Sequence, residues 1–318
     1  MEATSDILVQ KVLNKYDPTH TTTLRNAYAR EMKRRFDRLI RVIWESVVEK
    51  DCFGLKKDIS LHQFTPASWR QFAFPRSAEK LEAFMKWLQE QVDKGILDVR
   101  YLEQIGRAVE AHWQNLYLFD SYRRGIMRAR YEMRRRGRMD VPPPEKVMEF
   151  GALFGAPMHI DRLGLIFTRA YNELKGITDA MNMQISRVLA QGIADGDGMR
   201  LIARKLVATI NGKGVGDLGI TDTLGRFIPA RRRAEMLART EIIRAHHLAT
   251  IQEYRNWGVL NIEVMAEFKT AGDMRVCEKC ASLEGKRFTL DEIEGMIPVH
   301  PECRCIALPY IEELKEFY

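Results

Sequence analysis

The first half of the chain carries apolar residues at intervals of three or four, the spacing that gathers side chains on one face of an α-helix. From Thr23 this stripe runs through Leu24, Tyr28, Met32, Phe36, Leu39, Ile43 and Val47. The opposite face of this predicted helix is crowded with basic residues: Arg30, Lys33, Arg34, Arg38 and Arg41. A second helix is predicted after Ser77, a residue type that caps helix N-termini, and a third from about Tyr101. The pattern therefore predicts a basic helical domain over residues 1–140.

Three consecutive prolines, Pro142–Pro144, interrupt this pattern. Proline has no amide hydrogen and restricts the residue before it, so a helix cannot continue through such a run. We expect a linker at 141–150 and a second domain at 151–318. Helices are predicted in this second domain after the possible cap Asp161, after the break at Asp195–Gly198, and from Pro229 to about Trp257.

The hydrophobic period changes after Gly258. From Ile262 to Lys269 apolar and polar residues alternate, which is typical of a half-buried β-strand. We therefore expect helices over 151–258 and a small β-rich unit over 259–318. The predicted fold class is mainly α, with an N-terminal helical domain followed by a helical domain that ends in a small C-terminal α+β unit with a Cys/His cluster.

The composition excludes several classes of protein. The chain has 318 residues, of which 46% are hydrophobic and 29% charged, a balance typical of globular domains rather than of disordered chains. No apolar run approaches the 18 or so residues that a membrane span needs, and the start of the chain lacks the pattern of a signal peptide. We expect a protein made in the cytosol that makes no contact with a membrane.

The positive charge is concentrated in one stretch. The formal net charge of the chain is +7, and residues Ser121–Arg138 alone carry eight arginines against the single acid Glu132. Such a stretch is often just a solvated charged face, but its density favours a polyanionic partner, either DNA phosphates or an acidic protein surface. The candidate residues for binding this partner are Arg123, Arg124, Arg128, Arg130, Arg134, Arg135, Arg136 and Arg138.

Four of the five cysteines lie close together near the C-terminus. Cys277 and Cys280 form a Cys-x-x-Cys pair, and His300, Cys303 and Cys305 follow about twenty residues later. Zinc prefers four nitrogen or sulfur ligands, and two separated pairs of this kind can close around one ion. We predict a structural zinc site with Cys277, Cys280 and Cys303 as ligands and His300 or Cys305 as the fourth. The alternatives are thiols that only pack, or disulfides formed outside a reducing compartment.

A second candidate cluster is Arg239-Thr240-Glu241, in the helix that follows Pro229. Glu241 falls on the apolar face of this helix, where an unpaired carboxylate is costly. A structural ion pair or clamp, with Arg239, Arg244 or an amide of the β-rich unit, is therefore favoured over a catalytic acid. No residue is predicted to be catalytic.

The C-terminal motifs resemble a known family. They include Arg239-Thr240-Glu241, Tyr254 and Gly258, and continue through the segments Phe268–Cys277 and Pro298–Cys305 with Cys280, Gly285 and Phe288 between them. This set resembles the phage Mu F-like (SPP1-type) head morphogenesis family, the minor head or minor capsid proteins of tailed phages and prophages. The resemblance is specific over Arg239–Pro309 and extends loosely back to Asp161. Phe268 stands where the family usually has Trp.

The resemblance implies a bacteriophage minor capsid protein that works by binding and not as an enzyme. Such proteins associate with the portal vertex and are linked to head assembly, DNA packaging or ejection, so the expected partners are the portal protein, packaged DNA, and scaffold or major capsid protein. The expected location is the virion interior near the portal, after assembly in the host cytoplasm. Arg239, Thr240, Glu241 and Asp273 would act as a structural clamp. The alternative is a metal-dependent nuclease or peptidase associated with the head.

Overall fold

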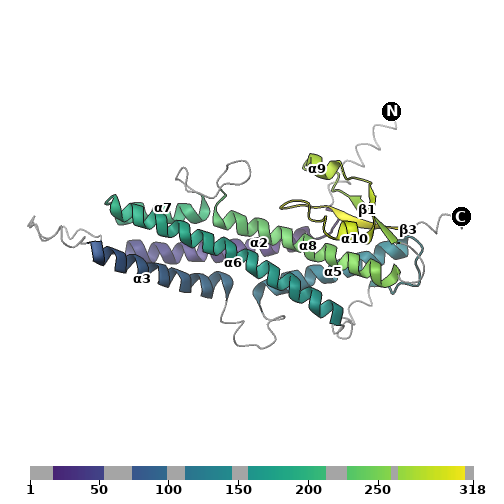
Figure 1. Cartoon of the computed structure of the whole chain (residues 1–318), viewed down its shortest axis with the longest axis horizontal. Helices are drawn as coiled ribbons and strands as arrows, with labels where there is room; N and C mark the ends of the chain where they lie inside the picture. Colours follow the sequence, from purple (N-terminus) through teal and green to yellow (C-terminus); the bar gives the residue numbers. More distant parts are fainter. Residues whose placement is uncertain are drawn as a thin grey trace, which may run out of the picture. The chain divides into compact units, whose positions relative to one another are not determined.

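The computed structural model describes residues 17–53, 74–98, 112–144, 157–212, 228–258 and 264–311. It is mainly helical with one small C-terminal sheet, which confirms the predicted fold class (Figure 1). The elements in chain order are α2 (Thr22–Trp44), η1 (Glu45–Glu49), α3 (Phe74–Val92), η3 (Asp93–Leu97), α5 (Trp113–Arg135), α6 (Pro157–Ala194), α7 (Met199–Asn211), α8 (Ala230–Gly258), β1 (Val264–Lys269), α9 (Glu278–Ala281), β2 (Arg287–Phe288), α10 (Leu290–Glu294) and β3 (Ile306–Ile311).

Two helix starts differ from the prediction. α3 begins at Phe74 and α6 at Pro157, so Ser77 and Asp161 lie inside helices and do not cap them. Both helices carry a proline in the first turn, where its missing amide hydrogen has no intrahelical acceptor to lose. The predicted start near Tyr101 falls outside the described residues. The break between α6 and α7 lies where it was expected, and Gly196 adopts a positive φ of 72° there.

The sheet has three antiparallel strands in the order β2-β1-β3. β1 pairs with β3 from Val264 opposite Ile311 to Lys269 opposite Ile306, and with the two residues of β2 on its other side. Along β1 the buried residues Val264, Ala266 and Phe268 alternate with more exposed ones. The predicted half-buried strand is therefore confirmed over its described part.

The chain forms two compact units, each built from separate segments. Unit 1 comprises residues 1–29, 109–170 and 236–318, and unit 2 comprises residues 30–108 and 171–235. Each unit thus draws on residues from both sides of Pro142–Pro144. Of the predicted linker 141–150, residues 145–150 lie outside the described part of the chain.

The core of unit 1 joins the sheet to two helices. α5 contributes Ala129 and Met133, and α8 contributes Ile243, Ile251 and Tyr254. The sheet and the loops beside it add Val264, Ala266, Phe268, Cys280, Ile293, Ile297, Cys303, Cys305 and Ala307. The Tyr254 hydroxyl donates a hydrogen bond to the carbonyl of Ala307, 3.2 Å away, which ties α8 to β3. The apolar face of the sheet is completed by α8, the helix that precedes it in the chain, and by α5, which lies far away in sequence.

The contact between α5 and α8 depends on small residues. A Cβ atom added at Gly125 would lie 2.3 Å from the His246 carbonyl oxygen of α8. One turn earlier, the Ser121 hydroxyl donates a hydrogen bond of 2.6 Å to the Ile242 carbonyl. The Thr250 hydroxyl donates in the opposite direction, to the Gly125 carbonyl at 3.2 Å. Only glycine at position 125 lets the two backbones approach this closely.

Unit 2 is a helical unit built around the apolar stripe of α2. The predicted stripe residues of this unit, Met32, Phe36, Leu39, Ile43 and Val47, are all buried. Side-chain contacts link its segments, such as the hydrogen bond of 2.6 Å from Asn182 of α6 to Gln89 of α3. Among the helices that the structure describes, none is long and apolar enough to cross a membrane.

Candidate metal centre

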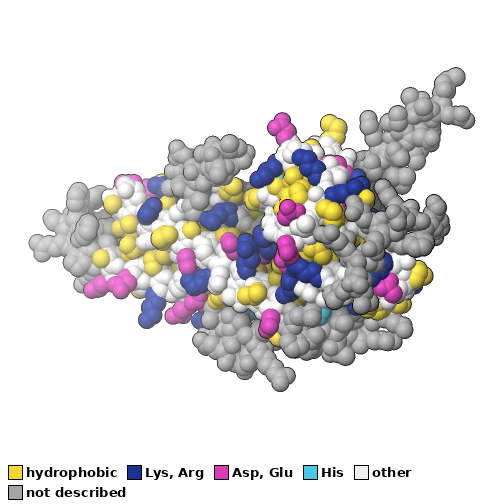
Figure 2. Space-filling model, turned by 45° about the vertical axis from the view of Figure 1, so that its right-hand side comes forward, with side chains coloured by type: hydrophobic (Ala, Val, Ile, Leu, Met, Phe, Trp, Pro, Cys, Tyr) yellow, Lys and Arg dark blue, Asp and Glu magenta, His cyan; other side chains and the backbone are white. Residues whose placement is uncertain are grey.

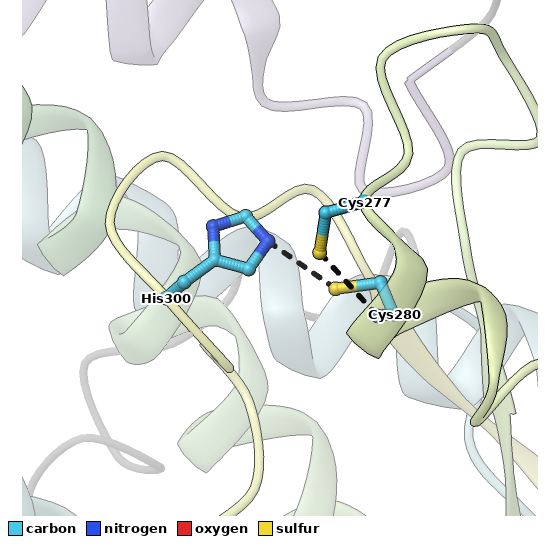
Figure 3. Close-up of side chains that lie close together, drawn as sticks. All are labelled: Cys277, Cys280 and His300. Carbon is cyan, nitrogen blue, oxygen red and sulfur yellow. Dashed lines mark hydrogen bonds between the residues drawn. The ribbon is translucent and has the colours of Figure 1, made fainter. Parts of the chain in front are cut away.

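The first pair of cysteines lies on a tight turn. Cys277 has extended backbone angles and immediately precedes the short helix α9, on which Cys280 lies. The Cys280 amide donates a hydrogen bond to Cys277 Sγ, with 3.4 Å between the atoms. This local geometry brings the two sulfurs close together, next to the ring of His300 (Figure 3).

The second group of candidate ligands lies on a turn that follows a proline-containing loop. The amide of Cys303 donates a hydrogen bond of 3.2 Å to the carbonyl of His300, and Glu302 between them has a positive φ of 61°. His300 Nδ1 lies 2.8 Å from the Pro301 carbonyl oxygen, which can only accept a hydrogen bond. The proton therefore belongs on Nδ1, and the free lone pair belongs to Nε2, 3.2 Å from Cys280 Sγ (Figure 3).

All five predicted ligand candidates come together around Cys280. Cys277, Cys280 and His300 place their donor atoms within 4.8 Å of one another, and so do Cys280, Cys303 and Cys305. In a tetrahedral zinc site with bonds of about 2.3 Å, neighbouring sulfurs lie about 3.8 Å apart. The donor set fits zinc, and the His300 hydrogen bond to a carbonyl is the usual way of orienting a histidine ligand. Cys52 is exposed and belongs to unit 2, apart from this cluster.

The cysteines affect one another's ionisation. Burial raises the pKa of Cys280 to about 12, and the neighbouring Cys303 adds to this effect. The hydrogen bond with Cys305 lowers the pKa of Cys303 to about 5, whereas the same bond and burial raise the pKa of Cys305. Buried sulfurs at this spacing cannot all be thiolates without a cation, because each negative charge opposes the next. A divalent metal ion would replace the protons and remove that conflict.

The residues between the candidate ligands attach this loop to its surroundings. The Glu302 amide donates a hydrogen bond of 2.9 Å to the Thr240 hydroxyl, and the Glu302 carboxylate pairs with Arg239 at 2.8 Å. Arg304 donates two hydrogen bonds of 2.6 Å to Asp273. These bonds hold the pKa of Asp273 well below its usual range. Arg239, Thr240 and Asp273, all predicted clamp residues, thus contact the loop that carries His300, Cys303 and Cys305.

Glu241 has different partners. It is buried, as its place on the apolar face of α8 predicts, with an exposed fraction of 2%. Its carboxylate forms an ion pair with Arg244 at 3.1 Å and lies 3.7 Å from Arg169 of α6. Arg244 is one of the partners expected from the sequence, whereas Arg239 binds Glu302. Glu241 is not among the groups of potential metal ligands in the described part of the chain.

The arginine-rich stretch lies on α5 and the turn after it, and most of its side chains bind within the protein. Arg130 is buried against Glu253, and Arg138 binds Asp140 and the Trp257 carbonyl. The other internal partners are Asp120 for Arg123 and Arg124, Glu132 for Arg128 and Arg136, and the Met139 and Val141 carbonyls for Arg134. Of the eight arginines, Arg135 is the one in the exposed class. On the face drawn in Figure 2, basic and acidic side chains are mixed.

Several structurally important residues were not singled out from the sequence. Glu302 and Arg304 lie inside the ligand motif, where the cysteines and histidine drew attention. Asp120 and Asp140 lie just outside the window in which the arginines were counted. The spacing of Asp120 from Arg123 and Arg124, three and four residues within a helix, was the signal that predicts such ion pairs, whereas Asp140 lies after the helix, two residues from Arg138.

These features define a mainly helical protein whose small sheet carries a Cys/His cluster held against a long helix. Residues 183–308 match the family described as Phage Mu protein F like protein. The match confirms the resemblance seen in the C-terminal motifs, and it relates the chain to head morphogenesis proteins of phages, which are associated with the virion. Neither the curated proteins nor the solved structures gave a significant match.

Proposed function

We propose that this protein is a minor structural component of a tailed-phage or prophage head that works by binding, at the portal vertex or on packaged DNA, and not by catalysis. The family match carries the proposal. Three acids near the Cys/His cluster support it, because Glu302 is paired with Arg239, Asp273 with Arg304, and Glu284 with Lys269. A hydrolytic site would need a base poised to accept a proton, and these carboxylates are held in ion pairs.

The Cys/His cluster serves in this proposal as a structural zinc site. Its support is that two groups of three donor atoms share Cys280, with the Nε2 lone pair of His300 turned to the Cys280 sulfur. Zinc would hold the knuckle of Cys277 and Cys280 to the loop that binds α8 through Glu302. The free energy of metal binding would then contribute to the folding of the C-terminal part of unit 1.

Metal analysis of protein purified under reducing, chelator-free conditions tests the zinc proposal. About one zinc per chain is expected, and it should be lost in the double variant Cys277→Ser, Cys303→Ser. Cys52→Ser removes an exposed cysteine outside the cluster and should keep the metal. Metal-free wild-type protein, or equal zinc content in the double variant, would contradict the proposal.

Incorporation into heads tests the structural role. When the chain is expressed with the portal, scaffold and major capsid proteins of its own phage, it should co-sediment with assembled heads at low copy. It should also co-purify with the portal protein when the other components are left out. Zinc-loaded protein should show no nuclease or peptidase activity. Heads that never contain the chain would contradict the structural role, and metal-dependent hydrolysis would favour the enzymatic alternative.

A further inference from the structure

A basic face of α2 remains exposed after the chain has folded. Five cations lie on it: Arg30, Lys33, Arg34, Arg38 and Arg41, here called the α2 basic stripe. At about 100° per residue they fall within an arc of about 140°, opposite the buried apolar residues of the same helix. All five are in the exposed class, and all belong to unit 2.

The two acids of α2 that lie beside or within the α2 basic stripe, Glu31 and Asp37, already have partners. Glu31 binds Arg34 and Arg35, at 2.7 and 3.0 Å. Asp37 lies between stripe residues on the helix surface and pairs with Arg231 at 2.8 Å. Within the described part of the chain, no ion pair engages the remaining four: Arg30, Lys33, Arg38 and Arg41. The stripe therefore keeps a net positive charge that the fold does not use.

The arginines of α5, in contrast to the α2 basic stripe, mostly have partners within the protein. The arginine-rich stretch has the higher charge density in the sequence. Most of its side chains, however, form ion pairs or hydrogen bonds with Asp120, Glu132, Asp140, Glu253 and backbone carbonyls. A polyanion would have to compete with these internal partners, several of which are buried. At Arg30, Lys33, Arg38 and Arg41 of the α2 basic stripe it would compete only with water and counterions.

We propose that the α2 basic stripe binds the phosphate backbone of duplex DNA. From Arg30 to Arg41 the stripe covers about 16 Å along the helix axis, enough to follow several successive phosphates. None of the exposed large hydrophobic side chains of the described residues lies on α2. A protein-binding surface would be expected to offer aromatic or aliphatic anchors, so phosphates suit this surface better than an acidic protein does. The choice of duplex DNA as the polyanion rests on the proposed function, since packaged DNA is the polyanion of a phage head.

Salt-dependent binding to a labelled, random-sequence DNA duplex tests the proposal. The test variant carries Arg30→Gln, Lys33→Gln, Arg38→Gln and Arg41→Gln in the full chain. The matched control carries Lys86→Gln, Arg187→Gln, Arg200→Gln and Arg204→Gln, which removes the same charge from exposed positions on α3, α6 and α7. Glutamine removes the charge without adding repulsion, and unchanged circular dichroism and melting temperature would show that both variants fold.

Wild-type protein and the control should bind with a steep salt dependence. The stripe variant should bind about tenfold or more weakly at low salt, and the slope of log affinity against log salt should fall by about three or four. Equal losses in both variants would overturn the assignment, because net charge alone would then account for binding. Wild-type protein that binds no duplex, together with loss of portal binding in the stripe variant, would overturn it in favour of an acidic protein partner. DNA binding by a protein that never enters heads would leave the stripe in place and refute the proposed function instead.

Discussion

At the scale of single residues, two glycines in similar helices differ in whether the packing around them requires glycine. Gly125 on α5 and Gly164 on α6 are both helical glycines of unit 1, yet the space around them differs completely. A Cβ at Gly125 would meet the His246 carbonyl at 2.3 Å, whereas one at Gly164 would meet nothing within 4 Å. The packing of α5 on α8 therefore depends on one missing methyl group.

Gly125→Ala should destabilise the protein by about 1 to 3 kcal/mol, because the two helix backbones must move apart to admit the methyl group. Gly164→Ala is the matched control and should be neutral or stabilising by up to about 1 kcal/mol, because alanine favours the helix. Denaturant-induced unfolding followed by circular dichroism measures both changes. Equal free energies of unfolding for the two variants would contradict the close contact.

Glu294 gives the stability a predictable dependence on pH. Hydrogen bonds from Arg255, together with Arg162, lower its pKa from 4.5 to about 2. As the pH falls from about 4.5 to 2, the unfolded chain takes up this proton before the folded one does, so this stabilisation is present above pH 4.5 and is lost towards pH 2. Glu294→Gln should be less stable than wild type at neutral pH, and the gap should close in acid.

Unfolding titrations at several pH values between 6 and 2 measure this convergence. Glu79→Gln, at an exposed position on α3, serves as the control and should leave the pH profile of the wild type unchanged. A constant difference in the free energy of unfolding between Glu294→Gln and wild type over this range would show that the ionised carboxylate is not stabilised by its arginines.

At the scale of elements, the charge on a helix is a poor guide to what the helix binds. α5 carries the closely spaced arginines, but it packs against α8 and the sheet. Its arginines form ion pairs with acids of its own segment and of α8. On α2 the five cations of the α2 basic stripe remain exposed to solvent. The packing of each element, and not its composition, decides which charges remain available.

Arg130 and Arg135 should therefore respond differently to the same change. Arg130→Gln leaves the buried carboxylate of Glu253 without its charged partner and should cost about 3 kcal/mol or more. Arg135→Gln alters an exposed side chain and should change the free energy of unfolding by less than about 0.5 kcal/mol. Chemical denaturation of the two variants makes the comparison, and a stability of Arg130→Gln equal to that of Arg135→Gln would refute the structural role of the buried pair.

At the scale of the whole molecule, the C-terminal sheet depends on helices from elsewhere in the chain. The core of unit 1 joins Phe268 and Ala307 of the sheet to Met133 of α5 and Tyr254 of α8. A zinc ion could cross-link the loops beside the sheet, but it cannot shield the apolar face of the sheet from water. The C-terminal unit predicted at 259–318 is therefore not expected to fold alone.

A fragment of residues 259–318 should lack a dispersed amide spectrum by nuclear magnetic resonance, even with one equivalent of zinc. The full chain should give dispersed resonances for the same residues when zinc is present. A well-dispersed, cooperatively unfolding fragment would show that the contacts with α5 and α8 are dispensable.

The local elements could be predicted from the sequence because their causes are local. Apolar spacing gave α2 and β1, the glycine turn separated α6 from α7, and the paired motifs indicated the cluster of four cysteines with His300. The starts of α3 and α6 were misplaced because a capping residue type was preferred over a first-turn proline. The domain division, the portal contact and the clamp roles stay predictions.

The sequence by itself determined the mainly helical class, the half-buried strand and the set of possible metal ligands, because hydrophobic period and residue chemistry act over a few positions. Only the tertiary structure decided that Glu302 and Arg304 fasten the ligand loop, that Gly125 sets the contact of α5 with α8, and that Arg130 of α5 is buried in an ion pair with Glu253 of α8. These features depend on contacts between residues more than 25 positions apart or on which face of a helix is covered. Neither can be predicted from a local sequence pattern.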